Sequence, residues 1–271
     1  MFGLFSLTVL RTERISPSLT RVTFGGADLA GFASGGRDQS LSLFLPHPGQ
    51  EEPQLPTGVG PDEWFGAYLA MPHDVRAVMR SYTVREQRAE PAELDIDFAL
   101  HADGGPACRW AERAEPGQRV AVLGPTVADN TGVRFRRPDD ADWVLIWADE
   151  TALPAAAASL ETLPAGTKAL VWIEVPFAAD RIELRTEADA EVTWLVREEG
   201  APDAADAVAA ADLPSPGTGY AWIAGESGSV KALRRHLVRE RAFDKKRVTF
   251  TGYWRRGVSE DLLRTEAAEE D

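Results

Sequence analysis

The apolar residues of this chain follow two rhythms, and the change comes at Arg137-Pro138-Asp139-Asp140. Before it, apolar and polar residues mostly alternate, as in 94–100, where Asp95 and Asp97 separate apolar side chains. Such alternation is typical of antiparallel strands with one buried face. After it, short continuous apolar runs alternate with helical segments, which is the pattern of a parallel sheet covered by helices. We therefore expect two domains, at residues 1–138 and 139–271.

The first domain is expected to be a small antiparallel barrel of six strands, because Gly- and Pro-rich connectors separate short alternating segments. A polar insertion at 46–61 should be a loop over or beside this barrel. The predicted strands lie at residues 4–9, 19–24, 41–45, 81–85, 94–100 and 119–123.

The second domain is expected to be a doubly wound parallel sheet. Its predicted strands are 143–147, 169–175, 192–196, 220–224 and 247–253, and its predicted helices are 153–163, 204–213 and 228–241. Ligands of such sheets bind beyond the carboxyl ends of the strands. Asp149, Glu150 and Thr151 follow the first strand and Glu226 follows the fourth, so these residues are candidates for ligand binding.

The composition narrows the classes of function. The formal net charge of -14 argues against nucleic-acid binding, which depends on neutralising phosphates with Lys and Arg. The longest apolar run, 143–148, is far shorter than the roughly 20 residues of a membrane-spanning helix. The single cysteine, Cys108, excludes an internal disulfide, and the scattered histidines have no ligand-like spacing. We expect a cytoplasmic protein without a bound metal and with a solvated acidic tail at 260–271.

The segment Arg80-Ser81-Tyr82-Thr83 lies near a predicted barrel strand. Alternate side chains of a strand share a face, so Arg80 and Tyr82 can point the same way. The guanidinium could then meet a phosphate and the phenol ring a flat heterocycle, while Thr83 could hydrogen-bond that heterocycle. A solvated arginine beside a packing aromatic is the simpler alternative.

A second segment, 101–111, contains two glycines and a proline before a short helical run. Such a turn exposes backbone N–H groups at a helix start, which can bind a pyrophosphate, although an ordinary turn has the same composition. Cys108 is expected to be structural rather than a nucleophile. The candidate ligand-binding residues of this segment are His101, Asp103, Gly104, Gly105, Ala107 and Trp110.

These segments together resemble the siderophore-interacting protein family of ferric-siderophore reductases, within the ferredoxin-NADP reductase-like flavoproteins. The resemblance implies FAD held by the Arg80–Thr83 strand and the Gly-Gly-Pro turn. It also implies NADPH or NADH near Asp149, Glu150, Thr151 and Glu226, with Tyr253 and Trp254 near the flavin. The segments that carry it are Asp38-Gln39, Arg80-Ser81-Tyr82-Thr83, His101-Ala102-Asp103-Gly104-Gly105-Pro106, Asp149-Glu150-Thr151-Ala152-Leu153-Pro154, Gly225-Glu226 and Gly252-Tyr253-Trp254-Arg255.

Two departures from the family pattern bear on the substrate and the nucleotide. Family members often carry His-Val-Lys after Asp-Gln, where the lysine is a proposed siderophore contact, but this chain has Ser40-Leu41-Ser42. Ala148 replaces a glycine common before Asp-Glu-Thr, which restricts the backbone where the nicotinamide nucleotide should approach.

The expected activity is reduction of a ferric siderophore, Fe(III) to Fe(II), with electrons that pass from NADPH or NADH to FAD. Ferric iron accepts one electron whereas a nicotinamide gives up a hydride, so a flavin is needed to split the pair. A basic rim would attract anionic ferric siderophores, and Arg255 and Arg256 are the candidates, although arginines at a strand end are often only solvent-facing. Arg181 and Arg197 are conceivable partners for a 2′-phosphate.

Two other functions fit the same sequence. One is a general flavin or quinone reductase, or diaphorase, of this fold, and the missing basic residue at Ser42 keeps it open. The other is a non-enzymatic binding protein that has lost the cofactor. Trp64 and Tyr68 could form part of a lid over the substrate, but we favour a packing role. A ferric siderophore is the expected partner, with no nucleic acid or membrane, and a monomer is expected.

Overall fold

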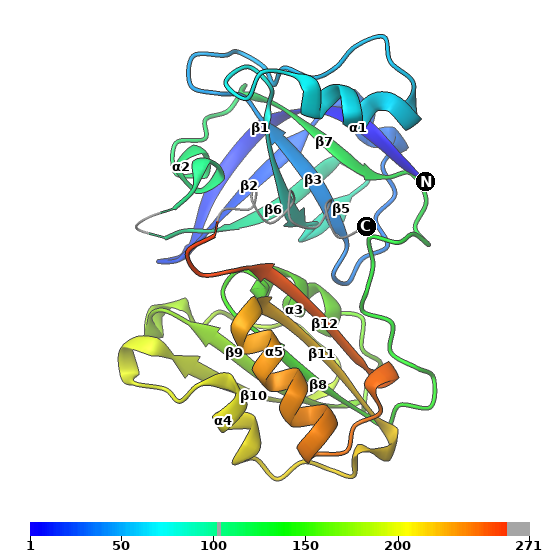
Figure 1. Ribbon diagram of the computed structural model, residues 1–271, viewed down its shortest axis with the longest axis vertical. Coiled ribbons are helices and arrows are strands. Elements are labelled where there is room, and N and C mark those ends of the chain that lie inside the picture. Colours follow the sequence, from blue (N-terminus) through cyan, green and yellow to red (C-terminus); the bar gives the residue numbers. More distant parts are fainter. Residues whose placement is uncertain (102–103, 259–271) are drawn as a thin grey trace. The chain divides into compact units, whose positions relative to one another are not determined.

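The computed structural model describes residues 1–101 and 104–258 (Figure 1). The chain forms two compact units. The first comprises Met1–Arg14, Thr20–Gly35 and Ser40–Gly132, and the second comprises Ile15–Leu19, Gly36–Gln39 and the chain from Val133 onward. None of the helices in these described ranges combines the length and the apolar character that a membrane span requires.

The first unit is a curled antiparallel sheet with the strand order β4-β3-β7-β1-β2-β6-β5. Its strands are β1 (Phe2–Ser16), β2 (Leu19–Gly25), β3 (Ser40–Leu45), β4 (Val78–Thr83), β5 (Glu86–Arg88), β6 (Glu93–Ala99) and β7 (Arg119–Pro125). The predicted antiparallel sheet is confirmed, but it has seven strands rather than six. The additional strand β5 has three residues, all half-buried and polar, so no alternation of apolar side chains announces it.

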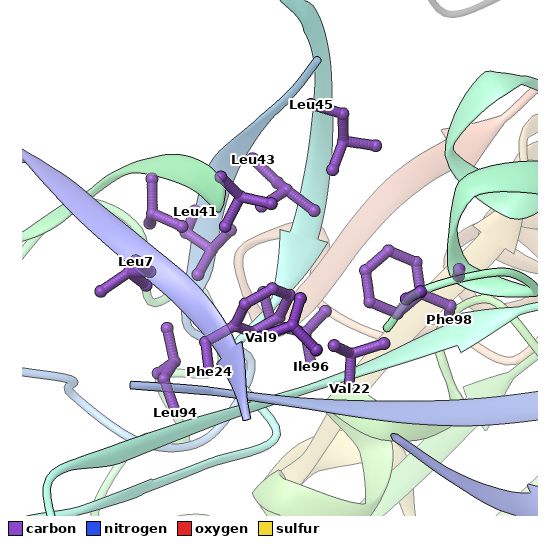
Figure 2. Packing of buried hydrophobic residues seen from close by; sticks show 14 of the residues in the cluster. Leu7, Val9, Val22, Phe24, Leu41, Leu43, Leu45, Leu94, Ile96 and Phe98 are labelled. Carbon is purple, nitrogen blue, oxygen red and sulfur yellow. The ribbon is translucent and has the colours of Figure 1, made fainter. Parts of the chain in front are cut away.

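The alternating apolar residues of these strands meet in one core, which Figure 2 shows from close by. On β6 the acidic residues that alternate with the apolar ones point to the other face of the sheet. Their carboxylates form ion pairs with arginines of β1, β2 and β5. The labelled core residues are Leu7, Val9, Val22, Phe24, Leu41, Leu43, Leu45, Leu94, Ile96 and Phe98. The ion pairs are Glu93 with Arg11 and Arg88, Asp95 with Arg88, and Asp97 with Arg21.

The long insertion has no regular structure until Pro61, where the helix α1 (Pro61–Ala70) begins. Tyr68 of this helix packs edge-on against Phe44 of β3 at a centroid distance of 5.7 Å and stacks on Trp64, also at 5.7 Å. The Tyr68 hydroxyl donates a hydrogen bond to the Ala77 carbonyl at 2.7 Å. These contacts support the packing role for Trp64 and Tyr68.

The second unit contains a parallel sheet with the strand order β10-β9-β8-β11-β12, which confirms the predicted doubly wound domain. Right-handed crossovers from β8 toward β9 and from β11 toward β12 run in opposite directions, so they place α3 and α5 on opposite faces (Figure 1). The strands are β8 (Trp143–Ala148), β9 (Lys168–Val175), β10 (Asp189–Val196), β11 (Gly219–Glu226) and β12 (Val248–Trp254). The helices are α3 (Leu153–Leu160), α4 (Ala204–Ala209) and α5 (Ser227–Arg235).

All three helices of this unit end earlier than the sequence predicts, and the first of them, α3, ends at Leu160 rather than at residue 163. Residues 204–213 are helical only to Ala209, and the predicted helix 228–241 ends as regular α-helix at Arg235. The next five residues, His236–Glu240, continue as a π-helical turn. Element ends are the least well-defined part of a helical pattern, because terminal turns tighten or widen to satisfy the last carbonyls.

Two buried aspartates hold the N-terminal segments of the second unit in place. Asp38 accepts hydrogen bonds from the backbone N–H groups of Arg134 (2.9 Å) and Phe135 (2.8 Å) and from Nε1 of Trp222 (2.9 Å). The Asp38-Gln39 segment of the family pattern therefore has a structural role here.

The second of these aspartates, Asp180, accepts hydrogen bonds from the Ser16 hydroxyl (2.6 Å), from the backbone and hydroxyl of Ser18 (both 2.8 Å) and from the Phe177 N–H (3.1 Å). A buried carboxylate with four donors is well compensated for its loss of water.

Candidate functional site

The strand β4 carries Arg80 and Tyr82 on one face. In the register with β3, Arg80 lies opposite Leu43 and Tyr82 opposite Leu41, and both leucines belong to the barrel core. Because directly opposed residues share a face, the two candidate side chains point to the core side of the sheet. Ser81 lies on the other face and is exposed, whereas Thr83 is buried.

The Tyr82 ring is one end of an aromatic row. It packs against Phe98 of β6 at 4.4 Å, Phe98 packs against Trp110 at 5.9 Å, and Trp110 lies parallel to Phe24 at 6.3 Å. Trp110 belongs to α2 (Pro106–Ala111), so the row joins that helix to three strands. The Nε1 atom of Trp110 is buried and has no hydrogen-bond partner among the described residues.

The turn before α2 requires glycine at position 104. A Cβ atom on Gly104 would lie 2.2 Å from Sγ of Cys108, so only glycine fits there, whereas the space around Gly105 is open. Pro106 is the first residue of the helix. The Cys108 sulfur accepts a weak hydrogen bond from the His101 N–H at 3.4 Å, and burial raises the pKa of its thiol. Cys108 therefore serves packing of this turn, as the sequence predicts.

The remaining candidates of the segment 101–111 differ in what they can offer. Ala107 is buried in the barrel core, so only its backbone N–H can face a ligand. A guanidinium N–H of Arg109 donates to the Gly104 carbonyl and secures the turn from the helix side. Asp103 lies outside the described residues. The first unit thus carries a cation and an aromatic ring on one face of β4, and the aromatic row connects that ring to the helix after the glycine turn. This combination is suited to a dinucleotide with a flat ring.

In the second unit, Asp149 is the centre of a hydrogen-bond network at the carboxyl end of β8. Its Oδ1 accepts from the backbone N–H (2.9 Å) and hydroxyl (2.6 Å) of Thr151 and from the Ala152 N–H (3.3 Å). Its Oδ2 accepts from the Glu226 N–H and from Nε1 of Trp254, both at 2.7 Å. Burial, and then the neighbouring Glu150 carboxylate, raise the pKa of Asp149 to about 6, against the effect of these donors.

Glu226 caps the helix α5. Its carboxylate accepts hydrogen bonds from the backbone N–H groups of Gly228 (2.5 Å) and Ser229 (3.0 Å), and its other oxygen accepts from the Arg256 N–H at 3.3 Å. A helix N-terminus attracts anions, and here the anion is supplied by the chain itself. A phosphate of a bound nucleotide at this helix end would have to displace the Glu226 side chain.

Glu150 and the two predicted 2′-phosphate partners are engaged in ion pairs. Glu150 is only 2% exposed and forms two bonds, at 2.6 and 2.9 Å, to the Arg197 guanidinium, which also reaches Glu174 at 3.0 Å. Arg181 pairs with Glu199 at 2.5 Å. The positive charge of both arginines is thus largely neutralised.

The end of β12 carries the last four candidates. Tyr253, Trp254 and Arg255 are half-buried and Arg256 is exposed. The Trp254 carbonyl accepts a hydrogen bond from the Ser227 hydroxyl at 2.8 Å, so this tryptophan is held both at its backbone and at its indole.

The structure therefore gathers Asp149, Thr151, Glu226 and Trp254 at one edge of the parallel sheet. The sequence predicts Phe24 and Phe98 only as strand residues, so their place in the aromatic row was not expected. Ser227 follows the fourth predicted strand directly after Glu226 and was expected at this edge, but nothing local indicates that its hydroxyl reaches β12. Among the described residues, no group of His, Cys, Asp or Glu side chains is arranged to hold a metal ion.

Comparison with models of known protein families shows to which family this chain belongs. Residues 8–129 match the siderophore-interacting FAD-binding domain, and residues 141–257 match the siderophore-interacting protein model. The chain belongs to the siderophore-interacting protein family. The resemblance seen in the sequence is thus confirmed.

Relatives and solved structures agree with this assignment. The chain is 32% identical to the ferric vibriobactin reductase ViuB of Vibrio cholerae, over 96% of this chain and 92% of that protein. It is 34% identical to the NADPH-dependent ferric-chelate reductase of Escherichia coli, over 92% and 91%. The crystal structure of the siderophore-interacting protein SipS from Aeromonas hydrophila matches with a TM-score of 0.77 at 32% identity, over 98% of this chain and 97% of that one. A siderophore utilization protein from T. fusca matches with a TM-score of 0.78 at 34% identity, over 95% of each chain.

Proposed function

We propose that this oxidoreductase of the siderophore-interacting protein family uses NADPH or NADH to reduce a ferric siderophore through FAD, and so releases iron as Fe(II). The observation that carries the proposal is the site in the FAD-binding domain, where Tyr82, Phe98 and Trp110 lie beside a glycine turn.

In this proposal each residue of the first unit has a separate task. Arg80 binds a phosphate group by charge-assisted hydrogen bonds. The N–H groups at Gly105 and Ala107 meet the pyrophosphate, and the Gly104 turn keeps them accessible. Tyr82 supplies a flat surface for the ring, and the Thr83 backbone or hydroxyl hydrogen-bonds it. FAD, when bound, supplies the conversion of a hydride into single electrons.

The second unit would bind the nicotinamide nucleotide at the carboxyl edge of its sheet. Thr151, whose hydroxyl is fixed by Asp149, and the Glu226 carboxylate are the polar groups that this edge offers. The Glu150 carboxylate is buried and paired with Arg197, so we do not assign it a direct contact with the nucleotide. Both 2′-phosphate candidates are already paired with carboxylates, so the 2′-phosphate of NADPH would compete with these carboxylates for the guanidinium groups.

The substrate would be an anionic ferric siderophore that meets Arg255 and Arg256 after β12. The family's lysine position is Ser42, which lies opposite Ser81 in the β3–β4 register. Both serines lie on the strand face away from Tyr82. This chain lacks that cation on β3, and Arg255 and Arg256 are the basic residues that we assign to the substrate. We place the protein in the cytoplasm as a monomer.

The test starts from the purified protein, which should be yellow with bound FAD. Anaerobic mixing with NADPH or NADH and a panel of hydroxamate and catecholate ferric siderophores should then produce a ferrous complex with a chromogenic Fe(II) trap. A colourless protein would favour the binding-only function. Reduction of a quinone or free flavin without any siderophore reduction would favour the general reductase, for which the absent lysine at Ser42 is the specific indication.

A further inference from the structure

We propose that Asp149 is a positioning residue, which acts on hydride transfer by fixing the Trp254 indole, and that it is not a ligand of the nicotinamide nucleotide. The inference rests on the proposed function. It adds a division of labour within the carboxyl edge of the sheet, between residues that touch the nucleotide and a residue that orients them.

The Asp149 side chain bridges strands that do not pair with each other. It follows β8, whereas Trp254 ends β12, and β11 lies between these two strands in the sheet. The carboxylate spans β11 at Gly225, which has a φ of +146°. A Cβ atom at Gly225 would lie 2.6 Å from the Asp149 carboxyl carbon, so the path across β11 exists only because residue 225 is glycine.

Direct binding of a nucleotide by Asp149 conflicts with its surroundings. The residue is 2% exposed, and five N–H and O–H groups already donate to its two oxygens. Two carboxylate oxygens offer about four lone-pair positions, so no acceptor capacity is left for a ribose hydroxyl or an amide.

Fixing the indole is the function that these contacts do allow. Trp254 is held at two points, since Nε1 donates to Asp149 and its carbonyl accepts from Ser227. Rotation of the ring would take a donor away from a buried carboxylate, which is costly. The plane of the indole is therefore set by Asp149. An indole is a flat surface on which a nicotinamide or flavin ring can stack, and a displacement of about 1 Å in a reacting pair slows reaction strongly.

The test compares Asp149→Asn, Trp254→Phe and the double variant in anaerobic stopped-flow reduction of the bound FAD. Each single change should lower the rate at saturating nucleotide about tenfold. Both changes remove the same hydrogen bond, the one between Trp254 and Asp149. The double variant should therefore be no slower than the slower single variant. In Asp149→Asn the nucleotide dissociation constant should change less than about twofold, because Asp149 itself does not contact the nucleotide.

Asp180→Asn is the matched control. Asp180 is a buried aspartate of the same unit with its own set of donors, Ser16, Ser18 and Phe177, and it lies outside the β8–β11–β12 edge. It should lower the melting temperature while the rate of flavin reduction stays unchanged. This separates loss of stability from loss of positioning.

Several results would overturn the inference. They are a raised dissociation constant with an unchanged rate in Asp149→Asn, rate effects that multiply in the double variant, or a wild-type rate in Trp254→Phe. A wild-type rate in Trp254→Phe would overturn the inference even if Asp149→Asn does not fold. If the wild-type FAD is not reduced by either nucleotide, the proposed function fails instead, so the two failures are distinguishable.

Discussion

Replacement of Asp149 by asparagine should remove a pH-dependent contribution to stability whose sign can be worked out. Burial and the Glu150 carboxylate raise the pKa of Asp149 from 3.8 to about 6 in the folded chain. The folded state therefore holds this proton more tightly than the unfolded state, and the contribution of Asp149 to the free energy of unfolding falls as the pH rises between these two values. A shift of about two pKa units corresponds to on the order of 3 kcal/mol.

The assay is urea unfolding of the holoprotein and of Asp149→Asn over a series of pH values, followed by circular dichroism. The stability of the native chain relative to the variant should decrease from about pH 4 to about pH 6 and stay level at higher pH. The asparagine variant lacks the titrating group but keeps all other carboxylates. The difference in unfolding free energy between the two proteins therefore reports the titration of Asp149. A difference that is independent of pH, or that grows with pH, would refute the reasoning, because it would mean that the five donors outweigh burial.

Three further substitutions test separate parts of the account. Arg80→Ala should weaken retention of FAD by about 1.5–3 kcal/mol, measured as the flavin dissociation constant, because it removes a charge-assisted phosphate contact. Gly104→Ala should lower both the flavin content and the melting temperature, since its methyl group would overlap the Cys108 sulfur; such overpacking costs about 1–3 kcal/mol. Arg197→Ala should lower the free energy of unfolding by about 3 kcal/mol, because it leaves the buried Glu150 carboxylate with one strong partner fewer.

The two arginine substitutions each have a control in the same unit. Arg119→Ala removes an exposed arginine paired with Glu52 and should leave flavin binding intact. Arg181→Ala breaks an ion pair of largely exposed groups and should cost less than about 1 kcal/mol. Unchanged flavin occupancy in Arg80→Ala would remove that residue from the site. Equal costs at Arg197 and Arg181 would contradict the importance of burial at Glu150.

The sequence predicted best those features that depend on periodicity. Alternation along 94–100 gives the inward face of β6, and continuous apolar runs give the strands of the parallel sheet. The helix α1 was not predicted, because the proline-rich insertion before it masks a helix that begins with a proline at its first position. β5 was missed because three polar residues carry no period.

In the candidate site, too, the positions of residues after strands were predictable and their long-range contacts were not. Asp149 was predicted from its place after a strand, but its contact with Trp254 joins residues 105 positions apart, and no local pattern encodes it. Glu226 was expected at the nucleotide, whereas the structure gives its carboxylate to the first turn of α5. Glutamate is not among the preferred residues for capping a helix, so propensity gave no warning.

The central claim, electron transfer from a nicotinamide through FAD to a ferric siderophore, is tested most directly by sequential anaerobic mixing. The FAD of the purified protein is first reduced with NADPH or NADH, then mixed with a ferric siderophore while flavin absorbance and an Fe(II) chelate are recorded together. We predict that the flavin reoxidises as about two ferrous ions form per flavin, since a hydride carries two electrons. A flavin that stays reduced with every siderophore, yet is reoxidised at once by a quinone, would contradict the account.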